Sequence, residues 1–283
     1  MNHNSINIGE RSYCGDYGMI NSAGELHAEK STIKRLNSAG ECTFTECKLI
    51  KVRSAGQVNM ISSSCEDFYN IGDANFSGEC SGKTIAICGG ATADLLECEL
   101  LVYRKIDRTK IQTSKIGLNG YFKSEVFECC EPIYINFEYD FHTIISAASI
   151  TSAKEIACER LIALDALSVP SLNAADILLP ALCGMKLESV TGERIRVLRH
   201  IDVVRELRGI PNDGMLPKKV DASGTIAHIT SVEGDDITLE NTYCDNVCGT
   251  NIKIGDMCVV NRVECSGELE ISPKAAVNEI VRG

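Results

Sequence analysis

The stretch SGECSGKT at residues 77–84 has the residue types of a phosphate-binding loop. That motif requires a glycine, four intervening residues and then Gly-Lys-Ser/Thr at the start of a helix. Here Ser77 stands where the first glycine is needed, and Gly78 comes one position too late. The residues after Thr84, IAIC, are typical of a strand. We therefore predict no nucleotide site and expect Lys83 to be an outward-facing, solvated side chain.

The 15 cysteines form several close groups that suggest metal binding. A structural zinc site usually has two pairs at CxxC-like spacing, and this sequence has no CxxC. Four C-terminal cysteines would converge if they lay on adjacent coils of a repeat: Cys244, Cys248, Cys258 and Cys265. The interpretation we favour is a set of reduced, buried or half-exposed thiols, because free cysteine behaves as a small hydrophobe. We predict no metal and no cofactor.

Nucleophilic catalysis finds little support in the sequence. There is no GxSxG elbow. The five histidines are scattered without a recognisable partner spacing: His3, His27, His142, His200 and His228. We expect each of them at the surface or at a corner, and we predict no catalytic residue.

Carboxylates are densest at Glu233-Gly-Asp235-Asp236. Carbohydrate lyases and hydrolases built on β-helices use clustered Asp residues on one outer face, so this cluster keeps an enzymatic alternative open. It also coincides with a repeat motif, and an acidic run on the outside of a repeat is explained as a solvated face.

The composition restricts the partners of the chain. Its 283 residues are 44% hydrophobic and only 5% aromatic, and the formal net charge is −11. An acidic chain repels phosphate backbones and anionic lipid surfaces, so we expect no nucleic-acid binding. The N-terminus is polar, without the layout of a signal peptide, and no stretch reaches the ~18 apolar residues of a membrane span. We therefore expect a cytoplasmic protein without a transmembrane segment.

Two repeat signals run through the chain. Ser-Ala-Gly recurs at a constant interval, with glycines at Gly24, Gly40 and Gly56, and Gly72 continues the series. An eight-residue unit also recurs, with apolar residues at positions one, six and eight and a small residue at position three. It begins at Cys80, Leu96, Phe122, Ile156, Leu172, Val190, Val232 and Val247. We expect the glycine series to become the small third position of this unit.

These repeats predict an all-β fold, a single-stranded β-solenoid with ~16–18 residues per coil. Apolar and polar residues alternate over three to five positions and then break at a small residue, which is typical of short strands joined by corners. A small third position suits an inner corner, where Leu would overpack. At strand spacing, roughly 15 coils would extend on the order of 70 Å.

The stretch 198–221 interrupts the repeats with more charge and two prolines. Ile201, Val204 and Leu207 could form one short helical face, and Pro211-Asn212-Asp213-Gly214 is typical of a turn. We predict a main solenoid over 1–197, a linker or excursion over 198–221, and C-terminal coils over 222–283. The aromatic stretch from Tyr134 to Phe141 is expected to provide an exposed contact patch.

Three segments resemble the bactofilin-like, polymer-forming bacterial proteins, and more specifically their larger cytoplasmic members from Gram-positive bacteria. They are LNAADILLPALCGMKLESVTGERIRV (172–197), VEGDDITLENTYCDNVCGTNIKIGDMCVVNRVECSGELEIS (232–272) and the SAGE-type coils (22–57). The resemblance implies a right-handed β-solenoid, a scaffold role, end-to-end assembly and no catalytic residues. This chain departs from the small bactofilins because it is longer, rich in cysteine, interrupted at 198–221 and without proline-rich tails.

The function that we expect is therefore a non-enzymatic structural or scaffold protein that self-associates through the ends or faces of its solenoid. One alternative is a β-helix enzyme, either carbohydrate-active or an acyltransferase, with its site on an outer face. The hexapeptide repeats of acyltransferases are absent. Another alternative is a module that binds a protein partner on a flat face.

Overall fold

The computed structural model describes residues 3–104 and 117–283, without the side chain of His3. The chain forms two compact units. Unit 1 comprises Met1–Glu128 and Phe137–Phe141, and unit 2 comprises Cys129–Asn136 and His142–Gly283. Strands hold 73% of the residues, and their parallel sheet winds into about 17 turns in all, which confirms the predicted β-solenoid.

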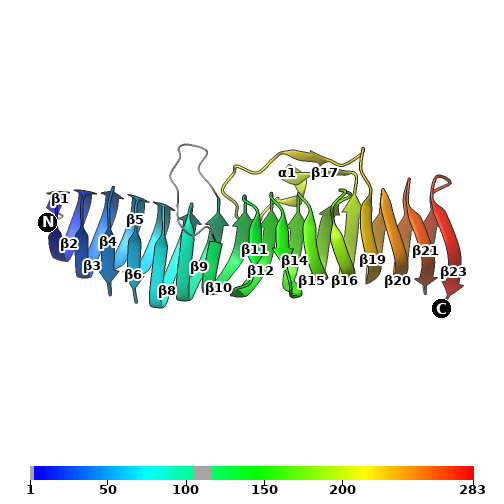
Figure 1. Cartoon of the computed structure of the whole chain (residues 1–283), viewed down its shortest axis with the longest axis horizontal. Helices are drawn as coiled ribbons and strands as arrows, with labels where there is room; N and C mark the ends of the chain where they lie inside the picture. Colours follow the sequence, from blue (N-terminus) through cyan, green and yellow to red (C-terminus); the bar gives the residue numbers. More distant parts are fainter. Residues whose placement is uncertain (1–2, 105–116) are drawn as a thin grey trace. The chain divides into compact units, whose positions relative to one another are not determined.

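Unit 1 winds coil upon coil, as the blue to cyan strands of Figure 1 show. Leu36 pairs with Val52, and Val52 with Phe68, so successive coils have the same length. Its strands are β1 (His3–Ile8), β2 (Arg11–Ala23), β3 (Leu26–Ser38), β4 (Cys42–Thr45), β5 (Lys48–Ala55), β6 (Val58–Ile61), β7 (Ser64–Ile71), β8 (Ala74–Ile87), β9 (Gly90–Tyr103) and β10 (Gly117–Cys129). Strand β12 (Glu138–Ser146) contributes residues to both units.

The Ser-Ala-Gly glycines of unit 1 form a ladder at one corner. A Cβ atom added to Gly40 would lie 2.4 Å from the carbonyl oxygen of Gly24, and Gly56 and Gly72 meet the preceding glycine in the same way. The ladder continues to Gly89. These positions must lack a side chain, because the backbone of the previous coil occupies its place.

The expectation that this ladder becomes the third position of the eight-residue unit is wrong. The third-position residue Gly82 pairs with Cys65, whereas the ladder passes from Gly72 to Gly89. The two repeat signals therefore mark two different corners of the coil. Both signals recur at similar intervals, but Gly82 follows Gly72 by only ten residues, which is less than one coil.

The aromatic residues of unit 1 are mostly internal. The rings of Phe127 and Phe141 stack with centroids 4.5 Å apart, and Phe122 meets Phe137 edge to face at 5.6 Å. Phe137 and Phe141 are both buried. The expected exposed patch from Tyr134 to Phe141 is therefore wrong, and Tyr134 is the only large hydrophobic residue exposed in that range.

Unit 2 repeats the eight-residue unit with like positions stacked on one another. Its third positions pair as Gly192 with Gly234 and Gly234 with Gly249, and its sixth positions pair in the same register. The strands are β11 (Ile133–Ile135), β13 (Ile150–Ser152), β14 (Ile156–Ala163), β15 (Leu167–Pro180), β16 (Lys186–Leu198), β19 (Ala227–Leu239), β20 (Thr242–Ile254), β21 (Val259–Cys265), β22 (Leu269–Ile271) and β23 (Ala276–Arg282).

The small third position of unit 2 has a local cause. A Cβ atom on Gly192 would lie 2.2 Å from the carbonyl oxygen of Ala174 and 3.4 Å from Cδ1 of Ile177. Gly249 meets Gly234 and Ile237 in the same way. The predicted lack of room is confirmed, and the nearest obstacle is the carbonyl of the preceding coil.

The excursion leaves the coils after β16 and returns at β19. It contains β17 (His200–Asp202), the short helix α1 (Val203–Glu206) and β18 (Lys219–Asp221), with β17 and β18 antiparallel. Figure 1 shows α1 and β17 along one border of the unit 2 coils. Strands β16 and β19 pair directly, so the solenoid continues beneath the insertion. The predicted boundaries at residues 197 and 222 stay a prediction.

The helical face predicted within the excursion is partly wrong. Ile201, Val203 and Leu207 are buried, whereas Val204 is 64% exposed. Because Ile201 belongs to β17 and α1 has only four residues, the buried side follows a strand and one helical turn instead of a continuous helix.

Candidate functional site

The phosphate-loop candidate lies within a continuous strand. Residues 77–84 belong to β8, and Lys83 is exposed. A Cβ atom on Gly82 would lie 2.8 Å from the carbonyl oxygen of Cys65. The glycine is thus required by coil packing, and its amide does not open toward a ligand.

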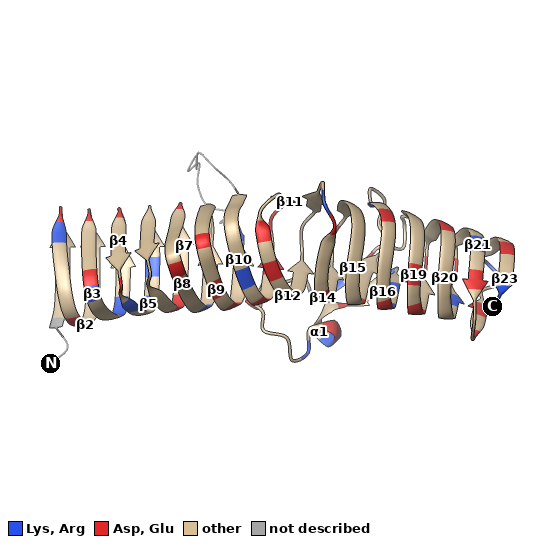
Figure 2. Ribbon diagram, turned by 90° about the horizontal axis from the view of Figure 1, so that it is seen from below, with Lys and Arg blue, Asp and Glu red and all other residues tan. Residues whose placement is uncertain are grey.

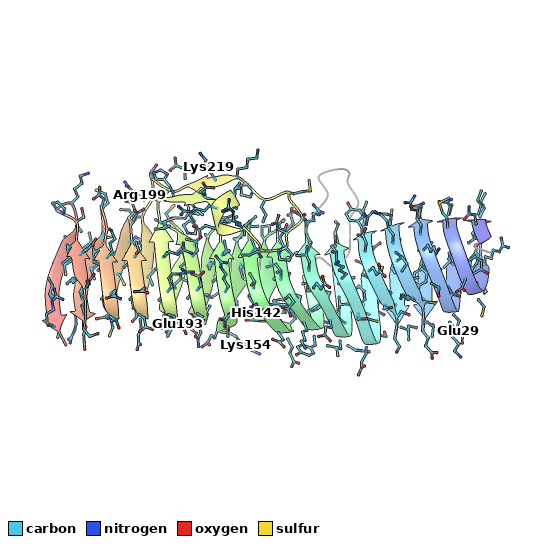
Figure 3. All side chains as sticks on the ribbon, turned by 180° about the vertical axis from the view of Figure 1, so that it is seen from behind. Glu29, His142, Lys154, Glu193, Arg199 and Lys219 are labelled. Atoms are coloured by element: carbon cyan, nitrogen blue, oxygen red, sulfur yellow. The ribbon has the colours of Figure 1, made fainter. Side chains whose placement is uncertain are left out.

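The histidines that the structure describes do not gather into one site. His142 is exposed, and His200 lies 3.4 Å from the exposed carboxylate of Asp221. The ring of His228 lies against Tyr243 on the next coil, with centroids 5.5 Å apart. Figure 3 labels His142 on unit 2, away from Arg199 and Lys219 of the excursion.

Ten of the 15 cysteines are buried and behave as small packing residues. Burial raises the pKa of Cys65 and of Cys98 to about 12, so both thiols stay protonated at neutral pH. The C-terminal thiols hydrogen-bond to separate backbone carbonyls: Cys244 to Asn246, Cys258 to Leu239 and Cys265 to Thr250. In the part of the chain that the structure describes, no group of three potential metal ligands contains them.

An acidic groove of about 650 Å³ lies on the outside of unit 2, over the small third position of the coils. Its floor takes one small residue from each of four coils: Ala174, Gly192, Gly234 and Gly249. Its sides carry five carboxylates: Glu159, Glu193, Glu233, Asp235 and Glu264. Figure 2 shows Asp and Glu on successive coils of this unit. The groove exists because the third-position residues are small, whereas the residues on both sides of this row carry larger side chains.

The Glu233 cluster is divided between two sides of the coil. Glu233 and Asp235 line the acidic groove, whereas Asp236 accepts a hydrogen bond from Nδ2 of Asn251 at 2.8 Å. Among the residues described, no three groove carboxylates lie close enough together to share a metal ion. The cluster in the sequence is therefore no compact acid site.

The two thiols of the acidic groove are poor nucleophiles. Burial raises the pKa of Cys158 to about 12. The pKa of Cys248 is raised by burial and by the charges of Glu264 and Glu233. Because the thiolate is the reactive form, neither residue is activated at neutral pH. The groove can attract cations, and it supplies no thiolate nucleophile.

An ion-pair network joins the excursion to the coils of unit 2. The Asp176 carboxylate lies 3.0 Å from Nε of Arg160 and 2.7 Å from Nη2 of Arg194. Arg196 lies 3.4 Å from the same carboxylate and 2.9 Å from Glu206 of α1. Arg160, Asp176 and Arg194 occupy one register position on adjacent coils, which brings the charges together.

The arginines determine the charge state of both acids in this network. Burial acts to raise the pKa of Asp176, but the hydrogen bond from Arg194 and the charges of Arg196, Arg194 and Arg160 hold it below its usual value. Burial likewise opposes ionisation of Glu206, and the hydrogen bonds from Arg205 and Arg196 lower its pKa. The network is therefore ionised at neutral pH and stabilises the docked excursion.

Unit 1 has one group of potential metal ligands that the sequence did not suggest. The ligand atoms of Glu10, Glu25 and His27 lie within 4.8 Å of one another. Arg11 pairs with Leu26, so the register of β2 and β3 brings Glu10 and Glu25, which precede this pair, close together. Both glutamates are exposed, and exposed carboxylates commonly gather without an ion.

No helix among the described residues is long and apolar enough to span a membrane. Comparison with known proteins finds no match to a family model, to a curated protein or to a solved structure. The fold and the geometry above define the chain as a β-solenoid with two units.

Proposed function

We propose that this chain is a non-enzymatic scaffold protein that associates with further copies of itself through its terminal strands. The observation that carries the proposal is a pair of strand edges with exposed isoleucines. Among the residues described, β1 pairs only with β2, and β23 pairs only with β21. Unpaired edges of parallel coils are templates for the addition of another strand.

The edge of β1 carries an apolar outer surface. Ile6 is 73% exposed and Ile8 is 87% exposed, whereas Asn7 between them is buried. Asn7 donates hydrogen bonds to Ser22 and to the carbonyl oxygens of Gly9 and Glu25, which fixes the strand in this orientation. A strand added beside β1 would satisfy its edge and bring further side chains against both isoleucines.

The edge of β23 exposes the apolar interior of unit 2. Ile280 pairs with the buried Val263 and so continues an inward-facing column, yet it is 50% exposed. In β22, Ile271 is 37% exposed and pairs with the buried Ile254. Addition of a further coil would bury these side chains, and burial of apolar surface favours association.

The net charge predicts how such association responds to salt. A chain with a formal charge of −11 repels its own copies at low ionic strength. Salt screens this repulsion, with a Debye length of about 10 Å at 0.1 M, while apolar contacts persist. We expect larger assemblies at higher salt, in contrast to assembly driven by ion pairs.

Sedimentation velocity and electron microscopy over a concentration series test the proposal. The wild type should form assemblies, and Ile8→Lys and Ile280→Lys should each shift it toward the monomer. Ile61→Lys is the matched control, because Ile61 is 37% exposed but belongs to β6, which pairs with strands on both sides. A monomer at every concentration and salt would contradict self-association.

A further inference from the structure

A second groove of unit 2, here called the aromatic groove, has about 720 Å³. Between its two rows of outward-facing side chains lies the backbone of four residues whose own side chains are buried in the core: Val169, Met185, Leu187 and Ile229. It lies over a different column of the coil from the acidic groove and shares no residue with it. In Figure 3, Lys154, which follows the lining residue Ala153, lies on the side of unit 2 away from Lys219 of the excursion.

One wall of the aromatic groove carries two rings and a cation. Ser168 pairs with Lys186, and His228 pairs with Tyr243. The His228 and Tyr243 rings have centroids 5.5 Å apart and planes inclined by 31°. His228 is exposed and Tyr243 is half-buried, and both line the groove, so part of each ring is accessible to a ligand there.

The other wall carries acceptors that are already held in place. Glu188 and Asp245 line the groove. Nδ2 of Asn261 donates to Oδ1 of Asp245 at 2.7 Å and to the Tyr243 hydroxyl at 3.2 Å. Asn278 in turn donates to Oδ1 of Asn261 at 3.0 Å. This chain of hydrogen bonds fixes the ring and the carboxylate before any ligand arrives, which reduces the entropy that binding would cost.

The groove retains hydrogen-bonding capacity for a ligand. The Tyr243 hydroxyl accepts from Asn261 and keeps its own hydrogen to donate, and Asp245 keeps its second oxygen. In residues 3–104 and 117–283, neither Lys186 nor Glu188 has an ion-pair partner. Donors and acceptors thus stand on both rows of side chains that border the groove.

This arrangement matches the chemistry of a sugar. A pyranose ring has an apolar C–H face that packs on an aromatic ring and an equatorial rim of hydroxyls that both donate and accept. One cation faces two carboxylates in the groove, which disfavours an anionic saccharide. A volume of this size suits a few sugar residues in an open groove.

An extended peptide fits the aromatic groove less well. Peptides that lie along sheets bind by hydrogen-bonding to an unpaired strand edge. The strands beneath this groove, β15, β16, β19 and β20, each pair with a strand on both sides. Only side chains face the ligand, so the recurrent backbone contacts of peptide binding are missing.

We propose that the aromatic groove binds a neutral oligosaccharide, with Tyr243 and His228 as the stacking surface and Asp245, Glu188 and Lys186 as hydrogen-bonding partners. This binding goes beyond the scaffold function and does not depend on self-association. It would give the assembled protein a means of attachment to a glycan.

Isothermal titration calorimetry of the whole chain with cellohexaose and with chitohexaose tests this site. We expect at least one of the two to bind with a dissociation constant of about 1 mM or tighter. Tyr243→Ala should weaken that binding about tenfold or more, and His228→Ala should weaken it about threefold. Tyr243→Phe keeps the ring and should retain most of the affinity.

Tyr134→Ala is the matched control, because Tyr134 is an exposed tyrosine of unit 2 in β11, outside the groove. It should bind as the wild type does. If Tyr243→Ala lowers the unfolding midpoint, the exposed His228→Ala variant decides the result. No binding of either sugar at about 5 mM, or binding unchanged in both groove variants, would overturn the proposal. Binding of a mixed pool of decapeptides at this groove, without either sugar, would also overturn it.

Discussion

Units 1 and 2 use the same winding but hold their coils together differently. In unit 1, Asp67 pairs at the surface with Lys51 and Arg53, and its side chain is 40% exposed. In unit 2, Asp176 is only 15% exposed and is contacted by three arginines, one of which also binds Glu206 of the excursion. The Asp67 ion pairs are thus exposed on the coils, whereas the excursion is attached to the coils of unit 2 by partly buried charges.

The two units also differ at their small-residue corners. In unit 1 the ladder glycine Gly72 has a backbone φ of +132°, a conformation that L side chains rarely adopt. In unit 2 the third-position glycine Gly192 has no such φ, and its column also contains Cys158 and Ala174. Both corners lack room, but only the ladder corner, at Gly24, Gly56 and Gly72, adds a conformational requirement for glycine.

The largest effect is therefore expected from Gly72→Ala. The new Cβ would meet the Gly56 carbonyl oxygen at 2.4 Å in a backbone conformation that alanine rarely adopts, so we expect about 3 kcal/mol of destabilisation. Gly192→Ala should cost less, about 2 kcal/mol, because its Cβ would also meet a backbone carbonyl oxygen, at 2.2 Å, but without an unfavourable φ in addition. Urea denaturation measures both. An equal loss of unfolding free energy in the two variants would contradict the additional conformational requirement at Gly72.

The next effect is expected at the two acidic residues. Asp176→Asn should destabilise unit 2 by about 2 kcal/mol, because it leaves partly buried arginines without their counter-charge. Asp67→Asn should cost less than about 1 kcal/mol, since exposed pairs are screened by water. The urea midpoints of the two variants give the comparison. A larger loss in Asp67→Asn would contradict the assigned roles.

A pH titration sharpens the same comparison. The pKa values of Asp176 and Glu206 are lowered from the ordinary values of 3.8 and 4.5. Their contribution to stability is therefore complete above those values and is lost as the pH falls through the lowered ones. We expect the urea midpoint of unfolding to decrease as the pH is lowered below 4.5, and to decrease less in Asp176→Asn than in the wild type. If the urea midpoints of the wild type and Asp176→Asn depend on pH in the same way, the charge of Asp176 does not contribute to stability as assigned.

The smallest effect concerns the cysteines and leaves stability unchanged. Iodoacetamide should modify the exposed Cys14 of unit 1 and Cys183 of unit 2 in the folded protein, whereas the exposed Cys248 should react more slowly because its raised pKa leaves less thiolate. The buried Cys65 and Cys98 should react only after unfolding, because burial raises their pKa and excludes the reagent. Peptide mass spectrometry assigns the sites. Rapid labelling of Cys65 under native conditions would contradict its packing role.

The coils were predictable from the sequence because each coil repeats its inward-facing residues. Ile195, Ile237 and Ile252 stack as their shared sixth position predicts. The position of each column around the coil was not predictable, because spacing gives the interval of a repeat but not the corner at which it lies. Gly72 and Gly82 stand ten residues apart in the sequence, and the strand register places them at two different corners.

The groove residues were harder to recognise. His228 and Tyr243 are separated in the sequence by close to one coil, and that spacing is a usable signal for a stacked pair. Lys186 and His228 lie on neighbouring coils but far apart in the sequence, because the excursion intervenes. The contact between Arg196 and Glu206 depends on how the excursion folds back, which no periodicity encodes.

Amide hydrogen exchange over a concentration series tests the central claim, that association uses the terminal strands. If further copies pair with β1 and β23, peptides covering residues 3–8 and 276–282 should gain protection together as the assemblies grow, whereas the central strand β6 should not change. Assembly without added protection at either terminal strand would contradict the account.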